Sequence, residues 1–99
     1  MTVPDTFERD MGCTEAELRR CLPQALAGLD WVAEDQGFCV RWPDAGGRLQ
    51  VRWAALPPRR LGLAVIPRLG LRFCFDGVPA DQRHAWLQRF DLYTRRGGG

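Results

Sequence analysis

Lysine is absent from this chain of 99 residues, and all 14 of its basic residues are arginine. A GC-rich genome, in which arginine codons replace lysine codons, explains this bias, and the abundance of Ala, Gly, Leu and Pro agrees with it. The flat guanidinium of arginine also suits phosphate, carboxylate and aromatic faces. Arginine content alone therefore does not indicate an anionic partner.

Histidine is almost absent, since His84 is the only one. Asp81 or Asp91 could orient it as a general base. However, the helix predicted around it places His84 off the apolar stripe and in solvent. No second histidine or motif serine completes a catalytic triad. The sequence therefore predicts neither an enzyme nor a cofactor.

The four cysteines, Cys13, Cys21, Cys39 and Cys74, contain no Cys-x-x-Cys pair. This spacing supports neither a zinc ribbon nor a thioredoxin-type site. Cys39 and Cys74 fall on polar strand positions and could meet Cys13 or His84 only if their strands were neighbours. Nothing in the spacing requires that arrangement, so no metal site is predicted.

Long apolar runs are also missing, and none approaches the roughly 20 residues of a membrane span. The first residues lack the basic and then apolar pattern of a secretory signal. Cysteines that stay reduced are the expectation for such a protein. We therefore predict a cytoplasmic protein without a membrane partner.

Charge is unevenly distributed. Residues 1–35 hold eight acids and three arginines, whereas residues 36–99 hold four acids and eleven arginines. Such asymmetry is typical of a surface for nucleic acid or for an acidic partner. It also fits an acidic segment lying across a basic sheet, or two subunits that meet head to tail.

Apolar and polar residues alternate in four short runs, which predicts half-exposed strands. The consecutive prolines Pro57 and Pro58 are expected to separate the second strand from the third, because proline cannot continue a central strand. Pro67-Arg68 is expected to turn the chain into the fourth. The predicted strands cover 37–42, 48–55, 60–66 and 69–75.

One helix is predicted before these strands in the sequence, and a second helix is predicted after them. Thr14 and Glu17 form a capping box that starts the first helix. Pro23 should kink or divide this helix near Cys21, and Gly28 is a natural stop. The second helix should run from Pro79 to about residue 95, with an apolar stripe of Trp86, Leu87, Phe90 and Tyr93.

The chain length predicts one domain over residues 1–99, with flexible ends at 1–5 and 97–99. A short strand over 6–11 would make a fifth strand, and residues 30–36 are expected to form a loop or an irregular strand. The predicted fold is an α+β two-layer sandwich, ordered (β)-α-β-β-β-β-α, with an antiparallel four- to five-stranded sheet and two helices on one face. Its core should include Trp53, Leu63, Phe73, Trp86 and Phe90.

Two resemblances accompany this prediction. The segment from Phe7 to Leu26, a short strand followed by Gly-Cys-Thr-Glu-Ala-Glu-Leu, is similar to the opening of helix-grip lipid-binding domains, and the element order resembles TATA-binding-protein-like folds. The helix-grip likeness implies a small apolar ligand between sheet and helices. The chain also resembles uncharacterised small bacterial proteins that end in Phe-Asp-Leu-Tyr…Arg-Gly-Gly-Gly, here residues 90–93 and 96–99.

The sequence therefore favours a non-catalytic cytoplasmic interaction module that self-associates, as a homodimer, or binds a protein partner through its exposed sheet face. One alternative is binding of nucleic acid or another polyanion through the arginines of that face. A second alternative is a small apolar ligand between sheet and helices. The candidate interaction face comprises Cys39, Arg41, Arg48, Arg52, Ala64, Ile66, Arg72 and Cys74.

Overall fold

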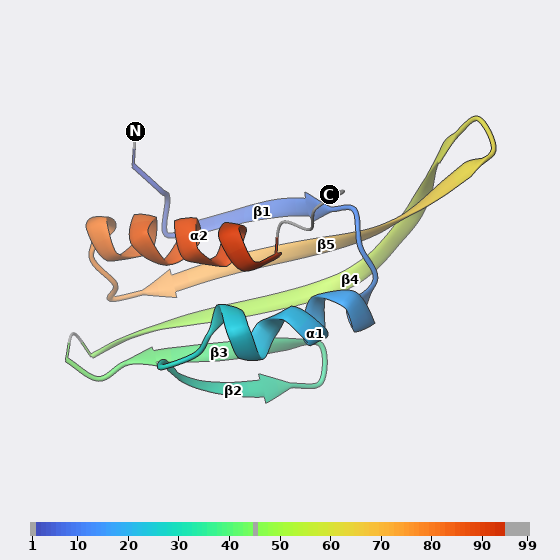
Figure 1. Ribbon diagram of the computed structural model, residues 1–99. Coiled ribbons are helices and arrows are strands. Elements are labelled where there is room, and N and C mark those ends of the chain that lie inside the picture. The colour runs from blue at the N-terminus through green and yellow to red at the C-terminus, as the bar shows by residue number, and fades with distance from the viewer. Residues whose placement is uncertain (1, 45, 95–99) are drawn as a thin grey trace.

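A computed structural model describes residues 2–44 and 46–94 of the protein (Figure 1). The five strands form one antiparallel sheet in the order β1-β5-β4-β3-β2. This arrangement confirms the predicted α+β fold and its element order. The elements are β1 (Thr6–Met11), α1 (Glu15–Ala25), β2 (Asp30–Glu34), β3 (Gly37–Trp42), β4 (Gly47–Leu61), β5 (Ala64–Asp76) and α2 (Ala80–Thr94).

Both helices cover the same face of the sheet (Figure 1). Leu18 and Leu22 of α1 and Phe90 of α2 are fully buried against Phe38 and Phe73 of the strands. Burying one face of the sheet under two amphipathic helices gives the chain a single core. Within the described part of the chain, neither helix has the length and apolar composition needed to cross a membrane.

Helix α1 begins with the predicted capping box. The backbone N–H of Thr14 donates to Glu17 Oε1 at 2.8 Å, and the N–H of Glu17 donates to Thr14 Oγ1 at 3.1 Å. The expected division near Cys21 is wrong, because α1 continues through Pro23 to Ala25. Pro23 lies in the last turn of the helix. The one backbone hydrogen bond that it removes is therefore close to the helix end, and its loss does not interrupt the turns before it.

Helix α2 buries a narrower stripe than the sequence indicated. Its buried residues are Trp86, Phe90 and Thr94, spaced at i, i+4 and i+8. Leu87 is half-buried, but Tyr93 is 38 % exposed, so its assignment to the stripe is wrong. The Thr94 hydroxyl donates to the Phe90 carbonyl at 2.7 Å and takes the inward position instead. The predicted helix end at residue 95 and the Arg-Gly-Gly-Gly end lie outside the described residues.

The predicted short strand over 6–11 is confirmed as β1, which pairs with β5. Residues 30–34, expected in a loop or irregular strand, form the regular edge strand β2. Trp31 supplies the only large inward-facing side chain of β2, and it is half-buried. A five-residue strand with one such residue gives little period-two signal, which explains its weak sequence pattern.

The predicted breaks in the second half of the sheet are wrong. Strand β4 continues through Pro57 and Pro58, and β5 continues through Pro67. The chain reverses instead at Gly62-Leu63, where Gly62 has φ 61°. Glycine with positive φ at the first central position is typical of a two-residue hairpin turn. The predicted strand over 60–66 is thus divided between two strands.

A β-bulge explains how three prolines fit into this hairpin. Leu56 pairs with Arg68, and Arg59 pairs with Ile66, so Pro57 and Pro58 on β4 oppose the single Pro67 on β5. A bulge leaves residues outside the hydrogen-bonded ladder. Proline lacks an N–H, so a position without a ladder bond is where a strand tolerates it.

The predicted core is confirmed at four of its five residues. Trp53 is 4 % exposed, Trp86 is 5 % exposed, and Phe73 and Phe90 are fully buried. Leu63 is 104 % exposed, so its prediction as a core residue is wrong. The reason is the turn at Gly62-Leu63, which lies far from both helices (Figure 1).

Candidate interaction surfaces

The sheet face that points away from the helices, here called the open face, gathers most of the predicted interaction residues. Strand register places neighbouring partners on the same face, and Gln50 lies between the two cysteines in one such row across the sheet. The structure brings together Cys39, Arg41, Arg48, Arg52, Arg72 and Cys74.

Acidic residues of the two edge strands frame these arginines. One row across the sheet reads Asp30, Arg41, Arg48 and Asp76. The edge strands β2 and β1 each carry two open-face carboxylates, whereas the arginines lie on β3, β4 and β5. The open face therefore carries as many carboxylates as guanidiniums: Glu8, Asp10, Asp30, Glu34 and Asp76 against Arg41, Arg48, Arg52, Arg68 and Arg72.

Two of the resulting ion pairs are loose and exposed. Arg41 Nε lies 3.9 Å from Asp30 Oδ2, and Arg72 Nη1 lies 3.5 Å from Glu8 Oε2. Exposed pairs of this kind contribute about 0–1 kcal/mol to stability. Their main effect is to reduce the positive potential of the open face.

Arg68 and Asp10 form a closer pair at the end of the open face. Arg68 Nη2 lies 2.5 Å from Asp10 Oδ2, and Arg68 Nη1 donates to the Pro57 carbonyl at 3.2 Å. The hydrogen bond from Arg68 holds the pKa of the Asp10 carboxyl below its ordinary value. Arg68 therefore joins the edge strand β1 to the bulge of β4.

The open-face cysteines do not meet. Cys39 and Cys74 each pair with Gln50, so one strand separates them. Two strand spacings amount to roughly 10 Å, which is beyond the reach of a disulfide or a shared metal ion. Among residues 2–44 and 46–94, no cluster of His, Cys, Asp or Glu could hold a metal ion.

Ala64 and Ile66, predicted to belong to the open face, lie instead on a projecting hairpin. The pairing of β3 with β4 ends at Arg52, and that of β1 with β5 ends at Leu69. Beyond these points β4 and β5 continue as a two-stranded ribbon, here called the arm (residues 56–68), which lengthens the molecule to 49 Å (Figure 1).

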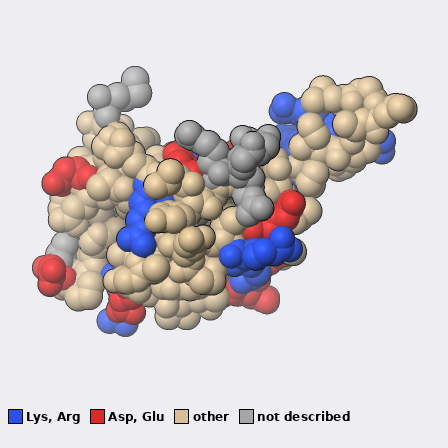
Figure 2. Space-filling model, in the orientation of Figure 1, with Lys and Arg blue, Asp and Glu red and all other residues tan. Residues whose placement is uncertain are grey.

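The arm exposes aliphatic side chains at its end. Leu61 is 58 % exposed, Leu63 is 104 % exposed and Val65 is 52 % exposed, and we call these three residues the tip. Arg59 and Arg60 follow directly behind, and neither forms an ion pair with any described residue. Figure 2 shows the uncharged end of the arm with arginine atoms behind it.

A groove lies at the base of the arm, next to the first turn of α1. It has a volume of about 310 Å³. The indole Nε1–H of Trp53 is buried at its side and has no acceptor among the described residues. Burial raises the pKa of the Cys13 thiol, which keeps it protonated at neutral pH. The residues that define this base groove include Cys13, Trp53, Ala55, Pro58, Pro67 and Leu69.

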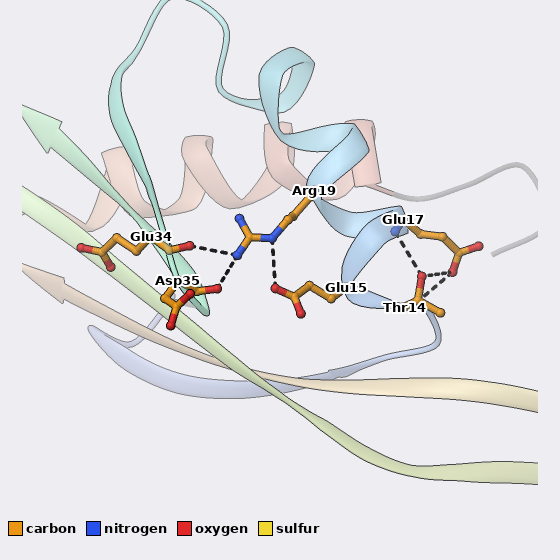
Figure 3. A network of polar contacts seen from close by, with 6 residues as sticks. All are labelled: Thr14, Glu15, Glu17, Arg19, Glu34 and Asp35. Atoms are coloured by element: carbon orange, nitrogen blue, oxygen red, sulfur yellow. Dashed lines mark hydrogen bonds and ion pairs between the residues drawn. The ribbon is translucent and has the colours of Figure 1, made fainter.

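Arg19 makes the wall of the base groove rigid (Figure 3). It donates to Glu15 Oε2 at 3.0 Å and to the carbonyls of Glu34 and Asp35 at 2.9 and 2.5 Å. Its guanidinium also lies 5.0 Å from the ring centre of Trp53, in a cation–π contact. The start of α1 is thereby fixed to the turn between β2 and β3.

The candidate histidine site does not assemble. His84 is exposed on α2, and its imidazole makes no hydrogen bond with another described residue. Asp91 is bonded to Arg9 of β1 and faces the sheet side of the helix. His84 therefore lacks the second residue that would orient it as a general base.

Sequence reasoning missed the arm and the base groove. The signal was present in the segment 57–67, where prolines flank a central Gly62 at either side. A glycine between two leucines, with prolines at both ends, is compatible with a hairpin turn inside an apolar run. The edge acids were also missed, because their partners depend on a strand register that composition does not reveal.

No protein-family model and no curated protein matches this chain. Its function is therefore inferred from its own residues.

Proposed function

We propose that this protein is a non-catalytic interaction module that self-associates, with the arm as its main contact element. The observation that carries the proposal is the exposure of Leu61, Leu63 and Val65 at the tip. Exposed aliphatic residues that gather in one place are typical of interaction surfaces. The four cysteines form no disulfide with one another within the described residues, which further supports a reducing, cytoplasmic environment.

The structure of the arm itself supports a covering partner. A two-stranded ribbon without a third strand or a packed face is marginally stable in water. The bulge prolines and Pro67 interrupt backbone hydrogen bonding along both strands of the arm. Proline on a strand edge opposes edge-to-edge pairing. The arm is therefore suited to contacts through its side chains rather than to extension of a sheet.

The open face is the contact surface expected from the sequence. In this proposal it ranks below the arm as a contact surface. Its arginines are balanced by carboxylates of β1, β2 and β5, and Val32 is an exposed apolar side chain among them. Balanced charge also ranks nucleic-acid binding below self-association, because affinity for a polyanion depends on unneutralised positive charge.

A small apolar ligand between sheet and helices ranks lower still. A hollow of about 240 Å³ lies between Leu29, Trp42, Trp86 and Arg89. Ligand pockets commonly measure roughly 300–1,000 Å³. The indole N–H of Trp86 and Nε of Arg89 lack acceptors among the described residues, and an apolar ligand would leave both unsatisfied.

Sedimentation equilibrium at micromolar concentration tests the proposal. The wild-type protein should form a dimer, and Leu63→Asp should shift it to monomer, because a charge at the tip cannot be buried without a partner. Leu92→Asp is the matched control, since Leu92 is 70 % exposed on α2. It should leave the dimer intact.

Two outcomes would contradict this function. A wild-type protein that stays monomeric over the whole concentration range would remove self-association. A dimer that persists in Leu63→Asp but is lost in Val32→Asp would place the contact on the open face instead of the arm.

A further inference from the structure

We propose that self-association is reciprocal, with the tip of each copy seated in the base groove of the other. The inference rests on the proposed function and adds the occupant, a second copy of this chain, and the place where it binds. The tip and the base groove are two complementary features that one chain cannot bring together by itself.

The first argument is shape. The arm has about six residues in each strand, so its tip and base are roughly 20 Å apart. Two arms that lie antiparallel, related by a two-fold axis, place each tip at the base of the other simultaneously. Such an isologous contact closes on itself and yields a dimer rather than a fibre.

The second argument is the side of the arm. Val65 and Leu69 are an even number of positions apart along the uninterrupted strand β5, and Ala55 pairs with Leu69. Residues at even spacing and cross-strand partners share one side. Val65 therefore lies on the side of the arm that continues into the base groove, as the two-fold arrangement requires.

The third argument is volume and chemistry. A cavity of roughly 150 Å³ accepts a benzene molecule, and the base groove has about 310 Å³. It therefore has room for the side chains of Leu63 and Val65. The indole of Trp53 lines the same groove and adds apolar surface on which these side chains can pack.

Charge supports the same arrangement. Glu15 lies at the wall of the base groove. Arg60 pairs with Val65 and so lies on the same side of the arm, and its guanidinium forms no ion pair with a described residue. An incoming arm therefore brings the Arg60 guanidinium towards the Glu15 carboxylate, one oxygen of which already accepts a hydrogen bond from Arg19. Opposite charges across an interface favour one register over others.

Disulfide trapping tests the inference directly, because Cys13 is a natural probe in the base groove. A tagged Leu63→Cys/Cys13→Ser chain is mixed with the untagged wild-type chain and oxidised with copper phenanthroline, which removes the two thiol hydrogens and their electrons. We expect a crosslink between the new tip cysteine and Cys13 of the wild-type chain. The crosslink should disappear when the untagged chain carries Cys13→Ser.

The base groove is tested separately by filling it. Ala55→Arg should weaken the dimer about tenfold or more, since the tip loses its burial. Ala16→Arg is the control, because Ala16 is exposed on α1 outside the groove. It should leave the dimer unchanged.

The outcomes separate this inference from the proposed function. A dimer that crosslinks through Cys39 or Cys74 instead of Cys13 would overturn the groove arrangement and leave self-association standing. A monomeric wild-type protein would overturn both. An oligonucleotide that binds the monomer and is lost in Leu63→Asp would assign the arm to nucleic acid and overturn the reciprocal dimer.

Discussion

Phe73 connects aromatic rings from three elements of the core. Its ring stacks on Phe7 at 4.6 Å between ring centres and meets Phe90 at 5.8 Å and Trp86 at 6.1 Å, both edge-on. Such offset and edge-to-face pairs add to the stability gained from burial alone. The side chain of Phe73 thereby joins β1, β5 and α2.

Phe73→Ala should lower the free energy of unfolding by about 3–5 kcal/mol, because it leaves a cavity at the centre of the core. Urea unfolding followed by tryptophan fluorescence measures this loss. Leu92→Ala, at an exposed position of α2, should change stability by less than about 0.5 kcal/mol. Equal effects of the two substitutions would contradict the assigned core.

Asp10 connects stability to pH. Its pKa lies below the ordinary value because Arg68 hydrogen-bonds to its carboxylate. A carboxyl with a depressed folded pKa stabilises the protein above its unfolded pKa, and this contribution is lost as pH falls through the folded pKa. Asp10→Asn should therefore be less stable than the wild type at neutral pH, with the difference vanishing in strong acid.

Urea unfolding over a series of pH values from neutral to strongly acidic measures this difference. It should be small, because the pair is partly exposed. Arg68→Gln should remove the same pH dependence. A difference between wild type and Asp10→Asn that stays constant with pH would show that the carboxylate charge is not involved.

The contrast between Phe73 and Leu63 shows what a residue pattern can predict. Both occupy apolar positions of a period-two run, and the pattern predicts the side on which such a residue lies. Phe73 is buried because helices cover that part of β5, whereas Leu63 lies at a turn beyond them. How deeply a side chain is buried depends on which elements cover that part of the strand. The local alternation of apolar and polar residues does not contain that information.

At the scale of elements, Gly37 determines how closely β3 and β4 approach. A Cβ at this position would lie 2.0 Å from the Val51 carbonyl oxygen, which is part of the backbone and cannot give way. Gly37 is buried and opens β3 directly after the turn from β2.

Gly37→Ala should therefore destabilise the protein by at least about 2 kcal/mol, through displacement of the β3–β4 pairing. Gly12→Ala is the matched control, because its Cβ would make an ordinary 3.6 Å contact with Ile66. That change should stay within about 1 kcal/mol of the wild type. Thermal unfolding by circular dichroism compares the two variants.

The two long strands show where element prediction failed. The rule that proline interrupts a strand holds for a continuous ladder, and Pro57, Pro58 and Pro67 all lie at one bulge. Helix α1 shows the reverse case, since its capping residues Thr14 and Glu17 act locally and were predicted from the sequence. Elements set by local contacts were predictable, whereas those set by cross-strand pairing were not.

At the scale of the whole molecule, the open face should bind nucleic acid weakly. Single-stranded oligonucleotides should bind no tighter than the roughly 0.1 mM to 1 µM of non-specific contact at physiological salt. The reason is the balance of carboxylates and guanidiniums on that face.

Fluorescence anisotropy at several salt concentrations measures this affinity. The triple variant Arg41→Gln, Arg52→Gln and Arg72→Gln should bind much as the wild type does. A submicromolar complex that weakens steeply with salt and is lost in the triple variant would instead assign nucleic-acid binding to the open face.

The sequence predicted the layers of the molecule but neither the charge balance of the open face nor the arm. Alternation and helix caps were sufficient for a sheet with two helices on one face. The charge balance of the open face depends on the position of β1 and β2 at opposite edges of the sheet. The arm forms because β4 and β5 extend beyond the ends of β3 and β1. Both are properties of long-range register.

The edge carboxylates have a consequence for the kinetics of encounter. Negative charge at both edges and positive charge in the middle make the open face an electric quadrupole, whose field decays faster with distance than that of a net charge or a dipole. Beyond a Debye length of roughly 8–10 Å it exerts little pull on an approaching molecule. Collisions on this side of the protein are therefore unsteered, whereas the guanidiniums of Arg59 and Arg60, which form no ion pair with a described residue, can attract an acidic surface towards the arm at low ionic strength.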